Sequence, residues 1–258
     1  MRTNILIAAK RHKDEPDARA AVQLLESYLE RRPGSADAGH SRRLYRTTFG
    51  RSLPPWWRPC DVVGFDISGD ESKEPDWLSR VMEPLAALSS PVTIHAGEAA
   101  SASSIWRAVY KLNALRIGHG LRLSENMALL GYCVREGICM ELCPNSNHHT
   151  NRFEPEQHSD ANLPVSLPRY EYPLLHYMRE GMEVTIGTDN RYLHRLGQES
   201  LTSEYMTAAR LVGGLTRWEA LQIVKAGFKN AFLDKAEVRD IVQSVEKEIY
   251  RIIATDNV

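Results

Sequence analysis

Short apolar runs rich in β-branched residues alternate along the chain with longer stretches whose apolar residues recur at helical spacing. Six of these short runs predict strands, over residues 5–9, 61–67, 91–95, 115–118, 137–142 and 183–187. The stretches between them predict helices. Strands that alternate with helices favour a parallel sheet joined by βαβ crossovers, so the pattern predicts an α/β fold.

Capping residues mark several of the predicted helix ends. Ser124 precedes a helix predicted over 125–136, and Gly137 follows it, as the preferences at helix ends require. The sequence Thr216-Arg217-Trp218-Glu219 has the form of a capping box and precedes an apolar run over 220–228. A further amphipathic helix is expected near the C-terminus. We expect these C-terminal helices, within about 216–258, to pack against the sheet.

One segment, at about residues 31–59, interrupts this alternation. It holds seven arginines against a single acid, Asp37, together with the pair Trp56 and Trp57. We interpret it as a basic insertion, because connections this long are uncommon unless they are functional or mobile. Two interpretations stay open: a solvated excursion, or a contact surface for phosphate groups or another subunit.

Composition narrows the class of protein further. The 258 residues are 43% hydrophobic and 25% charged, with a net charge of −1, which is typical of a globular protein and excludes a strongly basic nucleic-acid binder. No apolar stretch reaches the ~18 residues that a membrane span requires. The four cysteines lack paired spacing and favour a reducing compartment. The length allows one large domain or two small ones; we expect a single domain over 1–258 and a cytoplasmic location.

Polar residues capable of chemistry follow several predicted strands. His95 ends one strand and is followed by Glu98; His119 ends the next, and Asp189 follows the last. In a β/α barrel the carboxyl ends of the strands meet at one mouth, and catalytic groups come from several strands at once. An imidazole and a carboxylate are typical zinc ligands, and Glu98 and His119 can move protons. This set favours a metal-activated water that attacks an electrophilic carbon.

These motifs, in this order, resemble those of the adenosine deaminase family. The resemblance extends over about residues 62–233 and rests on Val62–Glu71, His95–Glu98, Arg116–Gly120, Glu141–Asn147 and Thr188–Asp189. It implies a TIM-type (β/α) barrel of the metal-dependent hydrolase kind. It also implies the hydrolytic deamination of a purine nucleoside or nucleotide, with release of ammonia.

The resemblance assigns roles to individual residues. It implies that His95 and Asp189 ligate one Zn²⁺ ion and that Glu98 protonates N1 of the purine, which makes C6 electrophilic. His119 would orient and deprotonate the water that the metal activates. The backbone N–H of Gly64 would donate to N3 of the base.

Asn190 stands where the family has a second Asp that contacts N7 of the purine. An amide carries N–H donors at every pH, so recognition of N7 can survive this change. Arg191 follows where the family has Pro, and with the Arg-rich insertion it suggests phosphorylated substrates.

The family's first strand carries a His-x-His pair that supplies two further zinc ligands, and this chain has no such pair. About six of the eight barrel strands are visible, and the two missing strands precede the first. We therefore expect an incomplete barrel: a C-terminal portion of a longer deaminase, a truncated product, or half of a site completed by another polypeptide, including a homo-oligomer. The alternative is a catalytically incomplete relative that acts in nucleoside binding or in the assembly of a larger prokaryotic complex.

Overall fold

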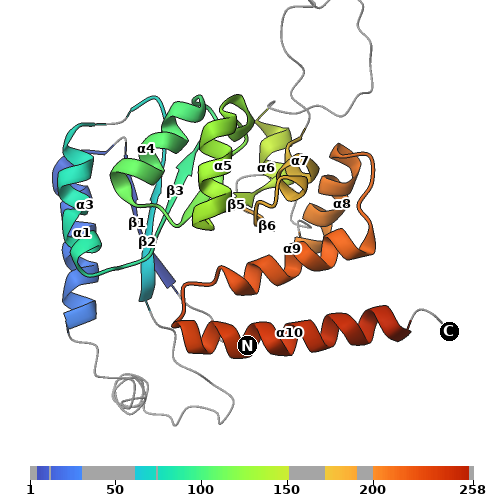
Figure 1. Ribbon diagram of the computed structural model, residues 1–258. Coiled ribbons are helices and arrows are strands. Elements are labelled where there is room, and N and C mark those ends of the chain that lie inside the picture. The colour runs from blue at the N-terminus through green and yellow to red at the C-terminus, as the bar shows by residue number, and fades with distance from the viewer. Residues whose placement is uncertain are drawn as a thin grey trace, which may run out of the picture. The chain divides into compact units, whose positions relative to one another are not determined.

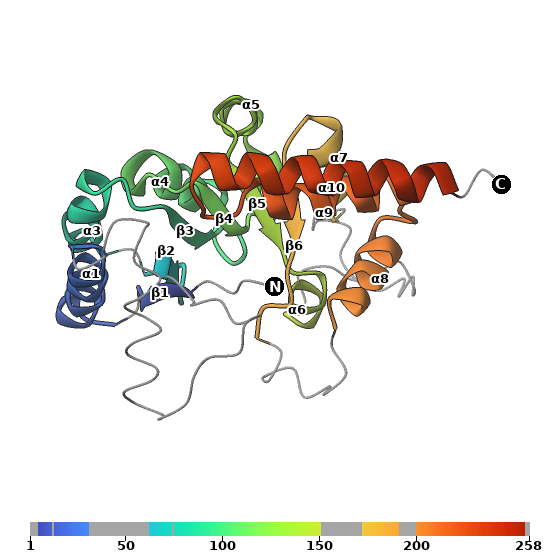
Figure 2. The ribbon, with the colours of Figure 1, turned by 90° about the horizontal axis from the view of Figure 1, so that it is seen from below.

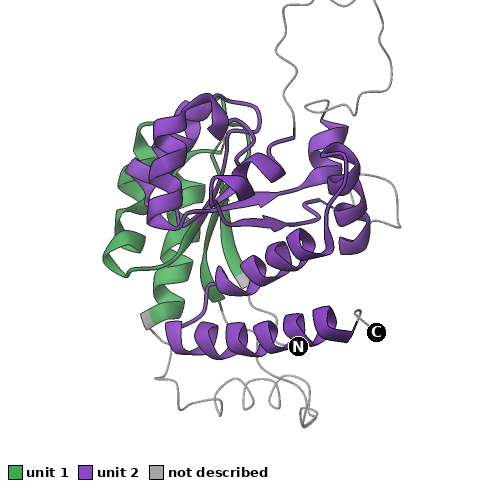
Figure 3. Ribbon diagram, turned by 45° about the vertical axis from the view of Figure 1, so that its right-hand side comes forward, with its two compact units in different colours: residues 1–92 green, residues 93–258 purple. Residues whose placement is uncertain are grey.

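A computed structural model describes residues 5–11, 13–30, 62–73, 75–150, 172–190 and 200–255. The chain divides into two compact units, residues 1–92 and 93–258 (Figure 3). Three features of the sequence lie outside the described residues: the Arg-rich segment at 31–59, Asp61 at the start of the second predicted strand, and Arg191. The prediction of a single domain over 1–258 stays a prediction.

The first unit is a βαβα arrangement. Its elements are β1 (Ile5–Lys10), α1 (Glu15–Glu30), β2 (Val62–Ser68) and α3 (Trp77–Ala87). The two strands are parallel, with Leu6 opposite Gly64 and Lys10 opposite Ser68. The two helices lie side by side in Figure 1 and are in contact. Leu25 and Leu85 are fully buried there, so the apolar stripe of each helix supplies this unit's core.

The second unit contains four strands, which pair in parallel and in sequence order. They are β3 (Val92–Ala96), β4 (Arg116–His119), β5 (Cys139–Leu142) and β6 (Val184–Ile186). The helical elements are α4 (Ala102–Leu112), η1 (Leu123–Glu125), α5 (Met127–Glu136), α6 (Pro144–His149), α7 (Leu174–Arg179), α8 (Leu201–Leu211), α9 (Arg217–Lys229) and α10 (Lys235–Thr255). Strands therefore occur at all six predicted places, each within about two residues of the predicted bounds.

Side chains on one face of this sheet are apolar, and those on the other are polar. Ile94, Ile117 and Met140 are almost completely buried on the first face. Their neighbours along each strand point to the opposite face, because strand side chains alternate. On that face the Glu141 carboxylate accepts a hydrogen bond from the Thr93 hydroxyl at 2.5 Å and pairs with Arg116 at 2.9 Å. His95, two residues after Thr93, lies on this polar face.

Two helix ends test the predicted caps. The capping box at Thr216 is present: its hydroxyl accepts from the backbone N–H of Glu219, whose carboxylate accepts from the backbone N–H of Thr216. The prediction of Ser124 as an N-cap was wrong, because residues 123–125 form a separate 3₁₀ turn. Asn126 is the N-cap instead, and its side chain accepts from the N–H of Leu129 at 3.0 Å.

The C-terminal helix α10 packs along α9. Figure 2 shows α10 running beside α9, and Lys225 of α9 forms an ion pair with Glu246 of α10 at 2.6 Å. Among the residues of α10, Ile249 is buried. Within the described ranges, every helix falls short of the combined length and hydropathy that crossing a bilayer demands.

Candidate active site

His95 and His119 come together at the ends of the adjacent strands β3 and β4. Their ring centroids are 5.1 Å apart, and the rings are nearly perpendicular, at 84°. Gly118 lies opposite His95 in the strand register. A Cβ atom at Gly118 would come within 2.5 Å of Cδ2 of His95, so only glycine leaves this space for the imidazole. The Gly118-His119 pair therefore both places one imidazole and makes room for the other.

The backbone after β4 holds His119 in an uncommon conformation. His119 has a φ of 66°, in the left-handed region that favours glycine, and is 2% exposed. The hydroxyl of Tyr177 in α7 donates to the carbonyl oxygen of Gly120 at 2.7 Å and accepts from the N–H of Leu123 at 3.1 Å. Tyr177 thereby ties the turn that carries His119 to a different helix.

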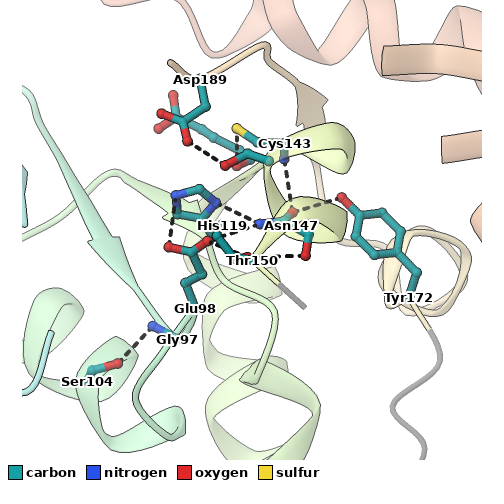
Figure 4. Close-up of polar contacts among 11 residues, drawn as sticks. Gly97, Glu98, Ser104, His119, Cys143, Asn147, Thr150, Tyr172 and Asp189 are labelled. Atoms are coloured by element: carbon teal, nitrogen blue, oxygen red, sulfur yellow. Dashed lines mark hydrogen bonds and ion pairs between the residues drawn. The ribbon is translucent and has the colours of Figure 1, made fainter. Parts of the chain in front are cut away.

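Glu98 reaches His119 from the turn after β3. Its Oε2 lies 3.5 Å from Nε2 of His119 (Figure 4). Gly97, with a φ of 71°, makes this turn, and its N–H donates to the Ser104 hydroxyl at 2.8 Å. The other carboxylate oxygen of Glu98 accepts from the Thr150 hydroxyl at 3.4 Å.

The short helix α6 supplies a third side chain to this cluster. Nδ2 of Asn147 lies 3.0 Å from Nδ1 of His119 and 3.5 Å from Oε1 of Glu98. Asn147 is fully buried. The buried carboxylate of Glu204, in α8, accepts from the backbone N–H of Asn145 at 2.9 Å and so holds the first turn of α6 in place. Helix α8, distant in sequence, thus helps to hold the helix that carries Asn147.

Asp189, after the end of β6, contacts Ser146, the residue before Asn147 in α6. Oδ2 of Asp189 accepts from the hydroxyl of Ser146 at 2.6 Å. Asp189 follows β6 with a φ of 48°, a left-handed conformation that a non-glycine residue rarely adopts. Asn190, directly after it, is exposed. Ser146 and Asn147 therefore connect Asp189 to His119 through α6.

The chain matches the family model described as adenosine deaminase over residues 47–248. The chain belongs to the adenosine deaminase family. An adenosine deaminase of Enterococcus faecalis is 31% identical over 192 residues, which are 74% of this chain and 52% of that protein. The chain thus spans about half the length of the curated deaminases that it matches.

Solved structures confirm the fold of this deaminase-family chain as an incomplete TIM-type barrel. An amidohydrolase from Burkholderia ambifaria, with bound Zn, has a TM-score of 0.70 at 18% identity, covering 98% of this chain and 58% of the other. An N6-mAMP deaminase from Arabidopsis has a TM-score of 0.62 at 18% identity, covering 96% of this chain and 59% of the other.

The structure brings four of the six predicted site residues into one connected cluster. His95, Glu98 and His119 touch one another or share partners, and Asp189 joins them through Ser146. Gly64 is a buried residue of β2 in the first unit, and its predicted contact with the base stays a prediction, like that of Asn190.

Three residues without an assigned role prove central to this cluster: Ser146, Asn147 and Tyr172. The first two belong to the recognised motif Glu141–Asn147, and only their contacts show what each side chain does. Tyr172 lies far from any motif, and its hydroxyl donates to Oδ1 of Asn147 at 3.1 Å. No local pattern in the sequence indicates this contact.

Two side chains of the cluster, His95 and Asp189, are of the kinds that hold metal ions. Gly118 leaves room for the imidazole of His95, and the carboxylate of Asp189 accepts from the Ser146 hydroxyl, the kind of hydrogen bond that orients a ligating carboxylate. Both donors suit zinc. Across the described residues, however, no group of three or more His, Cys, Asp or Glu side chains could hold a metal. Catalytic zinc normally has three protein ligands, so this part of the chain supplies a partial set.

Cys143, directly after β5, lies near Asp189. Burial, with the nearby carboxylate of Asp189 adding to it, raises the pKa of the Cys143 thiol well above its usual range in the metal-free protein. Cys143 is therefore a neutral packed side chain near neutral pH, 9% exposed.

Proposed function

We propose that this chain carries the proton-transfer half of a zinc-dependent purine deaminase, which hydrolyses a 6-aminopurine nucleoside or nucleotide to the 6-oxo compound and ammonia. The observation that carries the proposal is the close approach of Glu98 to His119, at 3.5 Å, beside the imidazole of His95. A packed strand end needs no carboxylate beside two imidazoles, whereas general acid–base chemistry does. Membership of the adenosine deaminase family gives the reaction class.

His95 and Asp189 are the residues that would hold zinc, and the remaining ligands would come from outside the described residues or from another chain. Zinc, when bound, would lower the pKa of a water molecule from ~15.7 to about 7. His119 would hold the attacking oxygen in place, and Glu98 would carry a proton to N1 of the purine. This division of labour fits their exposure: His119 is buried, and the Glu98 side chain is 22% exposed.

The proposed reaction adds water to C6 and then removes the amino group. The water oxygen bonds to C6 as one of its protons passes to Glu98, and the electron pair of the C6=N1 bond moves to N1, which takes that proton from Glu98. The C6–N6 bond then breaks, and the amino group leaves as ammonia with the proton of the new hydroxyl. The N–H groups of Gly64 and of the Asn190 side chain are the proposed donors to N3 and N7 of the base.

The purine itself and its phosphorylation state are part of the proposal. The Arabidopsis relative of similar fold is named for a nucleotide, N6-mAMP, and the arginines of the 31–59 segment and Arg191 suit a phosphate group. We propose a nucleotide before a free nucleoside. The cytoplasm is the proposed location, since the described cysteines 133, 139 and 143 are free thiols.

Ammonia release tests the proposal. The intact protein, supplied with zinc, is assayed with adenosine, AMP and ATP beside its Glu98→Gln variant. We expect Glu98→Gln to lower the rate by ~10²–10⁴-fold, as removal of a general acid or base does, while bound zinc stays unchanged. Glu136→Gln, an exposed carboxylate at the end of α5, is the matched control and should keep the full rate. An unchanged rate in Glu98→Gln overturns the proposed role, and equal rates with the three substrates overturn the preference for phosphate.

A second candidate is a non-catalytic relative that binds nucleosides. The partial set of metal donors among the described residues favours it. Calorimetric titration with adenosine and AMP separates the two functions. Binding without any ammonia release in the zinc-supplied protein supports the second candidate and excludes the first for this chain.

A further inference from the structure

The amide of Asn147 is held in one orientation by two hydrogen-bond donors. The backbone N–H of Cys143, which can only donate, lies 3.3 Å from Oδ1, and the Tyr172 hydroxyl donates to the same oxygen at 3.1 Å. Tyr172 is buried, and burial raises the pKa of its phenol well above the usual range, so the hydroxyl keeps its proton. A flipped amide would set its NH₂ group against the Cys143 N–H. Oδ1 of Asn147 therefore faces these donors, and Nδ2 faces His119.

This orientation decides which nitrogen of His119 carries a proton. Nδ2 of Asn147 lies 3.0 Å from Nδ1 of His119 and has only protons to offer, so Nδ1 is the acceptor. A neutral imidazole carries one N–H, which must then be on Nε2. Nε2 lies 3.5 Å from Oε2 of Glu98, a carboxylate oxygen that accepts. Donors and acceptors alternate without conflict from Tyr172 to Glu98 (Figure 4).

We propose that Asn147 is a positioning residue that sets His119 in its Nε2–H tautomer. The tautomer itself follows from the contacts of Asn147, whereas its catalytic consequence rests on the proposed function. With a proton on Nε2, His119 has no lone pair there to accept a proton from the attacking water. His119 then donates a hydrogen bond to the water oxygen, and the proton that leaves the water passes to Glu98, which delivers it to N1. This departs from the role of base that the family resemblance implies for His119.

Nitrogen-15 NMR of histidine-labelled protein tests the tautomer directly. Spectra are recorded at about pH 8.5, two units above the ordinary His pKa of about 6.5, so that neutral rings dominate. A His119→Gln variant assigns the signals of His119 among those of the nine histidines. We expect Nδ1 to show the downfield shift of an unprotonated nitrogen and Nε2 the shift of a protonated one. A protonated Nδ1 in the wild-type protein overturns the proposal.

The variant Asn147→Asp shows whether Asn147 sets the tautomer of His119 or whether the ring only follows the preference of free histidine. It keeps the shape of the side chain but places an acceptor where Nδ2 was, so Nδ1 of His119 should gain a proton. Asn145→Asp, two residues earlier in α6, adds the same charge to a side chain that contacts Ser203 and not His119, and should leave the signals unmoved. A folded Asn147→Asp variant whose Nδ1 stays unprotonated overturns the proposal.

Kinetics then separate this inference from the proposed function. If the chain releases ammonia, Asn147→Asp should lower kcat by ~10²-fold or more with KM nearly unchanged. An unaltered kcat in that variant overturns the catalytic consequence. If no ammonia is released but NMR finds the Nε2–H tautomer, the proposed function fails and the assignment to Asn147 stands.

Discussion

The hydroxyl of Tyr177 donates a hydrogen bond to the carbonyl oxygen of Gly120 at 2.7 Å. It also accepts from the N–H of Leu123 at 3.1 Å, so one buried oxygen satisfies backbone groups on both sides of the turn after His119. The turn needs this support, because His119 and Gly120 are consecutive residues with positive φ, at 66° and 64°. The position of the imidazole therefore depends on a helix that contributes no group to the chemistry.

Tyr177→Phe should destabilise the protein and loosen the position of His119. The variant removes two buried hydrogen bonds and leaves the Gly120 carbonyl and the Leu123 N–H with their bond to each other, at 3.2 Å. Each lost bond costs ~0.5–1.5 kcal/mol, so urea unfolding should show a lower midpoint, with a loss of about 1–3 kcal/mol. Tyr132→Phe, on the stacked aromatic surface of α5, is the control and should change stability by less than ~0.5 kcal/mol. Equal midpoints for the two variants would contradict the structural role of Tyr177.

Gly118→Ala should displace the imidazole of His95 while the fold persists. The new Cβ atom would lie 2.5 Å from Cδ2 of His95 and 3.2 Å from its Nε2, so the ring must move. If His95 binds zinc as proposed, equilibrium dialysis against zinc should show weaker binding, by the ~10–100-fold typical of disturbed metal-ligand support. Gly131→Ala is the matched control, since a Cβ atom at Gly131 of α5 meets nothing within 4 Å. It should bind zinc as the wild type does and gain up to about 1 kcal/mol in helix stability. Unchanged zinc binding in Gly118→Ala would argue against His95 as a ligand.

Gly97→Ala and Gly137→Ala form a pair that separates steric cost from backbone strain. Both glycines have left-handed φ values, 71° and 68°. At Gly97 a Cβ atom would lie 2.5 Å from Cδ1 of Ile105, whereas at Gly137 it would meet nothing within 4 Å. Gly137→Ala should cost only the ~1–2 kcal/mol of left-handed strain, and Gly97→Ala should cost ~1–3 kcal/mol more for overpacking. Chemical denaturation measures both, and a larger loss at Gly137 would contradict the packing around Glu98.

Stability should fall at alkaline pH because buried thiols resist ionisation. Burial raises the pKa of Cys133 and of Cys139 to about 12 in the folded protein, against about 8.5 in an unfolded chain. Between these values the native state binds more protons than the unfolded state, so the free energy of unfolding decreases as the pH rises. Their contribution is complete below about pH 8.5 and is lost progressively toward pH 12.

Urea midpoints measured from pH 8 to pH 10 test this dependence. The double variant Cys133→Ala/Cys139→Ala should be less stable throughout, with a shallower decline over this range. Alkylation by iodoacetamide, followed by mass spectrometry, should modify both thiols in urea but hardly at all in buffer. Rapid alkylation of the native protein would show that these side chains are not buried.

The sequence by itself determined the local elements and the chemistry at their ends. Strands and helices follow from the periodicity of apolar residues, and the capping box at Thr216 follows from short-range hydrogen bonds. Motif order placed His95, Glu98, His119 and Asp189 in one family's pattern, because each motif lies within a few consecutive residues. The N-cap at Asn126 was missed, since two polar residues compete there and the 3₁₀ turn is decided by packing.

Only the tertiary structure decided how these groups are held. Asn147 contacts His119 from 28 residues away, Ser146 meets Asp189 across 43, and Tyr177 reaches Gly120 across 57. Such contacts have no local signature, because they depend on which helix packs beside which strand end. The direction of each hydrogen bond, and with it the tautomer of His119, depends on donors and acceptors that meet only after folding.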